Sequence, residues 1–110
     1  MLNMFFNCSQ SRLRSPTAEQ VFANWPGVTT ASAGINQGAD TPLSAELLDW
    51  ADLVFVMEPV HRRKIAAKFR THLRGTRLIC LGIPDEYEYM DPGLIKVLEQ
   101  RVVSYLPQNL

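Results

Sequence analysis

The chain has 110 residues, which is enough for one domain with one hydrophobic core. Apolar residues make up 46% of it and charged residues 20%, which is typical of a globular protein and excludes a disordered one. Eleven basic residues balance eleven acidic ones, so no net charge favours nucleic acid or an anionic membrane, and no apolar run could span a bilayer. Two cysteines are too few for a disulfide framework, and the first residues lack the pattern expected of a signal peptide. We therefore expect a cytoplasmic protein with neither a nucleic-acid nor a membrane partner.

Strands and helices alternate along the sequence. Apolar and β-branched residues predict strands at residues 2–6, 28–33, 53–57 and 77–83. Helical patterns predict helices at residues 16–25, 42–50, 59–73 and 92 to about 106. Ser15 and Asp91, each followed by a proline, are the expected caps of the first and last helices. This alternation predicts an α/β fold over residues 1–110: one domain with a four-stranded parallel sheet and right-handed crossover helices.

The polar loop that follows the first expected strand carries the chemistry. Ligands of such a sheet bind at the carboxyl ends of its strands, where the N–H groups of a tight loop and a helix N-terminus can hold an anion. The same field favours the thiolate form of Cys8, which is the nucleophilic form. Arg14 can bind two oxygens of a tetrahedral oxyanion through its planar fork, and Ser15 can donate a hydrogen bond to the sulfur. A small buried hydrophobe is the alternative interpretation of Cys8. The residues expected to surround the oxyanion are Ser9, Gln10, Ser11, Arg12, Leu13 and Ser15.

Three segments of the sequence resemble one protein family. Cys8, five further residues and then Arg-Ser-Pro-Thr-Ala-Glu at residues 14–19 closely resemble the signature of the low-molecular-weight protein tyrosine phosphatases. Ser-Ala-Gly at residues 32–34 and Ala-Asp-Leu-Val-Phe-Val-Met-Glu at residues 51–58 resemble two later segments of that family, in the same order. The resemblance covers nearly the whole chain. It implies the family's three-layer α/β/α sheet, with the first strand central.

The sequence also departs from the family pattern. Gln10 and Ser11 stand where the family usually has a glycine and an asparagine, and Leu13 replaces a cysteine, so no protective disulfide within the site is expected. The chain is shorter than the family norm between Gly34 and Asp52, where the family has the aromatic wall of its substrate cleft. The resemblance thus identifies a shortened, phosphatase-like relative.

The resemblance implies an enzyme that hydrolyses phosphomonoesters, with protein tyrosine phosphate as the expected substrate. Its partner would be a phosphoprotein or a small phosphomonoester, the intermediate would be a cysteinyl-phosphate, and neither a cofactor nor a metal would take part. The alternative function, suggested by the altered loop and cleft, is a phosphate-binding or oxyanion-binding module of the same fold with little or no turnover.

A phosphatase of this kind needs a carboxylic acid to protonate the leaving oxygen. The family supplies it as an aspartate in a loop before the last helix, and two residues compete for that place. Asp91 precedes Pro92, but it stands where a helix cap belongs. Asp85 comes directly after the fourth expected strand, with Tyr87 two residues on, as in the family's loop. We favour Asp85 as the general acid and keep Asp91 as the alternative.

The two histidines and the second cysteine are expected to have structural rather than catalytic roles. His61 is expected on a solvated basic face of the third helix together with residues 62–64, and a docking site for an acidic partner is the alternative. Neither His61 nor His72 has cysteines or carboxylates at ligand spacing, so no metal site is expected. Cys80 lies in an apolar strand and is expected in the core. Because one additional cysteine does not supply the redox relay of an arsenate reductase, that function ranks third.

Overall fold

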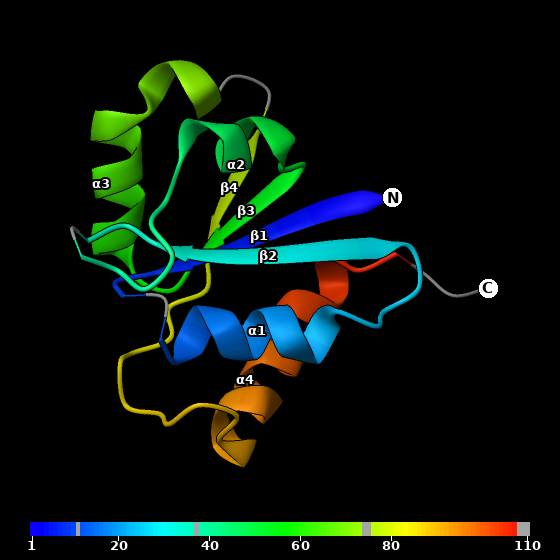
Figure 1. Ribbon diagram of the computed structural model, residues 1–110. Coiled ribbons are helices and arrows are strands. Elements are labelled where there is room, and N and C mark those ends of the chain that lie inside the picture. Colours follow the sequence, from blue (N-terminus) through cyan, green and yellow to red (C-terminus); the bar gives the residue numbers. More distant parts are fainter. Residues whose placement is uncertain (11, 37, 74–75, 108–110) are drawn as a thin grey trace.

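The structure, a computed structural model, describes residues 1–10, 12–36, 38–73 and 76–107. In this part of the chain four strands form one parallel sheet in the order β2-β1-β3-β4 (Figure 1). The strands are β1 (Leu2–Cys8), β2 (Val28–Gly34), β3 (Leu53–Val56) and β4 (Arg77–Cys80). The helices that connect and follow them are α1 (Arg14–Phe22), α2 (Ala45–Trp50), α3 (Pro59–Lys68) and α4 (Pro92–Val102). The expected four-stranded parallel sheet is confirmed.

The sheet has a helical layer and a separate apolar core on each face. Strand β1 is central, and its side chains alternate between the two cores. Helices α1 and α4 cover one face, where Phe6 stacks against Phe22 and Phe55 at centroid distances of 5.8 and 5.1 Å. Helices α2 and α3 cover the other face, where Phe5 packs with Leu48 and Ile65 (Figure 1). Because parallel strands with helices on both faces are buried on both sides, β1 and β3 read as nearly continuous apolar runs.

The helices differ from the predicted ones mainly at their ends. Helix α1 begins at Arg14 with Leu13 at its N-cap, so Ser15 lies inside the first turn and is not the expected cap. Helix α3 ends at Lys68 and is followed by a 3₁₀ turn over Arg70–Leu73. Helix α4 begins as expected, because the Asp91 carboxylate accepts a hydrogen bond from the backbone N–H of Gly93 at 2.8 Å. Among the described residues, no helix combines the length and the apolar character needed to cross a membrane.

Candidate active site

The loop after β1 and the loop after β4 line a small open cavity at the carboxyl edge of the sheet. Its volume is about 190 Å³. The residues that line it are Cys8, Ser9, Gln10, Arg12, Leu13, Arg14 and Asp85. The structure therefore brings together nearly all the residues singled out in the sequence. Ser11 lies outside the described residues, and Ser15 is fully buried next to the cavity.

Cys8 is the last residue of β1, and 3% of its surface is exposed. Its sulfur lies 3.0 Å from the hydroxyl oxygen of Ser15, which belongs to the first turn of α1. A thiolate can only accept a hydrogen bond, so in that form of Cys8 the Ser15 hydroxyl is the donor. This contact explains why the hydroxyl does not cap the helix. It also places a donor where negative charge on sulfur would need one.

The backbone of the loop packs closely against the segment that follows β2. The backbone N–H of Asn36 donates to the carbonyl of Ser9 at 3.0 Å, and that of Asp40 donates to the carbonyl of Gln10 at 2.9 Å. Gly34 makes this approach possible, because a Cβ atom there would lie 2.7 Å from the carbonyl oxygen of Ser9. The glycine of the Ser-Ala-Gly segment is therefore needed for close packing against the loop.

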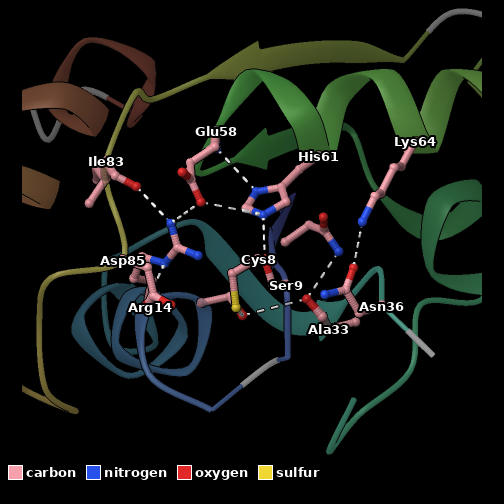
Figure 2. Close-up of polar contacts among 12 residues, drawn as sticks. Cys8, Ser9, Arg14, Ala33, Asn36, Glu58, His61, Lys64, Ile83 and Asp85 are labelled. Atoms are coloured by element: carbon pink, nitrogen blue, oxygen red, sulfur yellow. Dashed lines mark hydrogen bonds and ion pairs between the residues drawn. The ribbon is translucent and has the colours of Figure 1, made fainter. Parts of the chain in front are cut away.

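Arg14 begins α1 and is buried, with 2% of its surface exposed. Its Nη1 atom donates to Glu58 Oε2 at 2.7 Å and to the carbonyl of Ile83 at 2.8 Å (Figure 2). Its Nε atom lies 3.8 Å from Asp85 Oδ1. The guanidinium is thus held by the segments that follow β3 and β4. The carboxylate of Glu58 offsets the cost of burying its charge and fixes the orientation of its fork.

The two candidate acids occupy different places. The Asp85 side chain lines the cavity beside Arg14 and is 63% exposed, so it can contact both a ligand and water. Asp91 does not line the cavity, and its carboxylate caps α4. Tyr87 packs partly against the core, and Tyr89 is exposed. The geometry therefore favours Asp85 over Asp91 for proton transfer.

Two residues beside the cavity carry roles that the sequence analysis did not assign. Glu58, directly before α3, holds Arg14 as described above. His61 is fully buried, so the expectation that it lies on a solvated basic face is wrong. Its Nε2 atom lies 2.8 Å from the hydroxyl oxygen of Ser9, and its Nδ1 atom accepts a hydrogen bond from the backbone N–H of Glu58 at 3.1 Å. The position of His61 four residues before the apolar Ile65 was the available signal, since residues at that spacing share a helix face.

The other reactive side chains lie away from the cavity. Cys80 packs partly buried in the core beneath α2 and α3, whereas Cys8 belongs to the core on the opposite face of the sheet. Arg62 donates to the carbonyl of Leu78 at 2.6 Å and so covers part of the β4 edge. Within the described residues, no three His, Cys, Asp or Glu side chains are grouped as metal ligands would be.

The pKa of His61 is lowered from 6.5 to about 4, chiefly by burial. The positive charges of Arg14 and Lys64 contribute to this lowering, and the negative charges of Glu58 and Asp85 partly oppose it. Between pH 4 and 6.5 the unfolded chain therefore binds a proton at this ring that the folded protein does not bind. The free energy of unfolding should fall as the pH is lowered through this window, and His61 should account for about 2 to 3 kcal/mol of that fall.

Urea unfolding at several pH values between 7 and 4 measures this dependence. His61→Asn keeps an acceptor for the backbone N–H of Glu58 but cannot titrate, so its stability should decline less steeply than that of the parent. His72→Asn, at a half-exposed histidine in the 3₁₀ turn, is the matched control and should retain the contribution of His61. Equal slopes for the parent and His61→Asn would contradict the prediction.

Solved structures of other proteins share the fold of this chain. No family model matches the sequence, and no curated protein matches it. Among solved structures, the tyrosine phosphatase Wzb from Escherichia coli K30 in complex with phosphate is 23% identical, with a TM-score of 0.75 over 96% of each chain. A low-molecular-weight phosphotyrosine phosphatase from Vibrio cholerae O395 is 14% identical, with a TM-score of 0.76 over 96% of this chain and 94% of that one. The YwlE arginine phosphatase from Geobacillus stearothermophilus is 19% identical, with a TM-score of 0.70 over 99% of this chain and 100% of that one. The resemblance inferred from the sequence motifs is confirmed, and the chain has the fold of the low-molecular-weight tyrosine and arginine phosphatases.

Proposed function

We propose that the protein is a cysteine-dependent phosphatase that hydrolyses phosphomonoesters through a cysteinyl-phosphate. The observation that carries the proposal is the cavity itself, because a thiol, a guanidinium group and a carboxyl group line the same small volume. These groups are Cys8, Arg14 and Asp85. Cys8 and Arg14 stand at the two ends of the loop after β1, and Asp85 lies far away in the sequence, in the loop after β4. The shared fold with tyrosine and arginine phosphatases supports the same function.

In the first step the Cys8 thiolate attacks phosphorus and the bond from phosphorus to the leaving oxygen breaks. Asp85, as a carboxylic acid, donates its proton to that oxygen, so the product leaves as an alcohol or phenol. Arg14 and the loop N–H groups hold the other phosphoryl oxygens, which carry the charge of the transition state. The exposed position of Asp85 beside the cavity allows it to reach the leaving group.

In the second step a water molecule attacks the cysteinyl-phosphate. The Asp85 carboxylate accepts a proton from that water, the bond from sulfur to phosphorus breaks, and inorganic phosphate is released. The Cys8 sulfur leaves as a thiolate, and the Ser15 hydroxyl at 3.0 Å donates a hydrogen bond to it. The cycle thus returns both groups to their starting forms. It requires a reduced thiol, which is why we place the protein in the cytoplasm.

The cavity and the structural neighbours support the proposed substrate class. Both tyrosine and arginine phosphatases share the fold. We propose phosphotyrosine in proteins as the substrate, and phosphoarginine is the alternative substrate against which it is tested. Leu13 supplies an apolar, 37%-exposed side chain at the cavity, which suits the ring of an aryl phosphate. Arg12, on the same lining, forms an ion pair with Asp40 at 3.0 Å, so its charge gives no strong argument against phosphoarginine and the two substrates are compared directly.

Phosphate release from p-nitrophenyl phosphate, phosphotyrosyl peptide and phosphoarginine tests the proposal. In parallel, iodoacetate should alkylate Cys8 faster than Cys80, and inorganic phosphate or vanadate should slow that reaction; mass spectrometry identifies the modified cysteine. Turnover together with this protection supports a phosphatase. Protection without turnover of any of the three substrates would instead support the binding module of the same fold.

Replacing Arg14 with lysine should weaken phosphate binding by about 2 to 3 kcal/mol, since the charge remains but the two-pronged fork is lost. This corresponds to a dissociation constant roughly 30- to 150-fold higher. The protection of Cys8 from alkylation by increasing phosphate measures that constant. Arg63→Lys, on the exposed face of α3, is the matched control and should bind phosphate as the parent does. A loss in Arg12→Lys with none in Arg14→Lys would assign the oxyanion contact to Arg12.

A further inference from the structure

The first turn of α3 contacts both ends of the loop that lines the cavity (Figure 2). Glu58, at the N-cap of α3, accepts a hydrogen bond from Arg14, the residue that ends the loop. His61, one turn later, contacts Ser9, which is the second residue of the loop. The two contacts span 44 and 52 residues of sequence. One helical turn therefore connects the beginning of the loop with its end.

The hydrogen bonds fix which nitrogen of His61 carries the proton. The backbone N–H of Glu58 donates to Nδ1 at 3.1 Å, so Nδ1 must be the unprotonated nitrogen. The proton of the neutral ring is then on Nε2, which donates to the Ser9 hydroxyl oxygen at 2.8 Å. Glu58 Oε2 lies 3.7 Å from Nε2, too far to compete for that proton. The buried ring thus has a single orientation and a single tautomer.

We propose that His61 is a positioning residue that holds the start of the phosphate-binding loop through Ser9, against the turn whose Glu58 holds Arg14. His61 does not line the cavity, so it acts on a bound oxyanion only through the residues that it contacts. Because the loop is anchored at both ends, it loses little conformational freedom when phosphate binds to its N–H groups. This pre-organisation raises the affinity for phosphate. The inference rests on the proposed function, because it concerns the same cavity.

The test measures the dissociation constant of inorganic phosphate by protection of Cys8 from alkylation. Loss of the contact in Ser9→Ala or His61→Asn should raise that constant about three- to tenfold, the effect of one hydrogen bond. In His61→Gln the side-chain amide reaches the position of Nε2 and can donate to Ser9, so phosphate binding should recover in part. Melting temperatures measured alongside report the structural effect of each change separately.

The double variant Ser9→Ala with His61→Asn shows whether the two residues act together. If they act through one contact, the double variant should bind phosphate no more weakly than the worse single variant. Ser104→Ala and His72→Asn, at exposed and half-exposed positions outside the cavity, are the matched controls and should bind as the parent does. Losses that multiply in the double variant, or phosphate binding unchanged in Ser9→Ala, would overturn the inference. So would a His61→Asn protein that melts earlier but binds phosphate as the parent does.

The failure of this inference is distinguishable from that of the proposed function. Binding of phosphate that depends on His61 in a protein without turnover would support the inference and contradict the phosphatase. Turnover in a protein whose phosphate binding does not change in the Ser9 and His61 variants would support the phosphatase and contradict the inference. Absence of any protection by phosphate in the parent would contradict both.

Discussion

Replacing Cys8 with serine should reduce the turnover of p-nitrophenyl phosphate roughly 10⁴-fold or more, since a neutral hydroxyl takes the place of the thiolate nucleophile. Cys8 ends a central strand and is almost fully buried, and serine is of similar shape. The variant should therefore fold. A hydroxyl at this position can still hydrogen-bond with Ser15, whose oxygen lies 3.0 Å from the sulfur in the parent. Because Arg14 and the loop are unchanged, phosphate binding should survive the loss of turnover.

These effects are measured by comparing parent and variant in initial rates, phosphate dissociation constants and melting temperatures. The alkylation assay needs the Cys8 thiol, so the dissociation constants of Cys8→Ser are measured by calorimetry. Cys80→Ser is the matched control, since that cysteine lies at the end of β4 in the opposite core. It should lose some stability and keep its turnover. A Cys8→Ser protein that retains turnover would show that another group attacks phosphorus. A protein that loses turnover only because it unfolds would be recognised by its melting temperature.

The parts of the molecule that depend on local sequence were predictable. Apolar runs placed all four strands, and a polar loop before a helix placed the cavity at the end of β1. Asp91 was predicted as a helix cap and is one, because capping is an interaction between residues two positions apart. Ser15 had the same sequence signal and does not cap, because its hydroxyl contacts the sulfur of Cys8. Whether such a residue caps its helix or contacts another side chain therefore depends on tertiary structure.

The surroundings of the loop could not be predicted in the same way. Glu58 lies 44 residues from Arg14, and His61 lies 52 residues from Ser9. No spacing rule connects residues so far apart, and only the packing of α3 on the sheet brings them together. The three basic residues after His61 favoured a solvated helix face, yet the ring is fully buried. An uncharged imidazole with two hydrogen-bond partners tolerates that burial, whereas a lysine or arginine there would need a countercharge.

The second large effect is expected on the rate of hydrolysis when each of the two candidate acids is replaced. If Asp85 protonates the leaving group, Asp85→Asn should slow hydrolysis of an alkyl or unactivated aryl phosphate about 10²- to 10⁴-fold. The loss should be much smaller for p-nitrophenyl phosphate, because its leaving group needs little protonation. Stability should change little, since the Asp85 side chain is 63% exposed and its contact with Arg14 is long, at 3.8 Å. Asp91→Asn should leave both rates and stability near those of the parent, because asparagine is also a good helix cap.

Rates of both variants on both substrates, with melting temperatures alongside, decide between the acids. The leaving-group dependence is the sharper measurement, because a general loss of structure would slow both substrates equally, whereas the loss of a proton donor slows chiefly the substrate with the more basic leaving group. A loss in Asp91→Asn with none in Asp85→Asn would contradict the assignment made from the cavity. If the rate loss of neither variant depended on the leaving group, and the parent turned over poorly, neither carboxylate would act as a proton donor at the cavity. The remaining chemistry would then be oxyanion binding by Arg14 and the loop, without the proton transfer that hydrolysis requires.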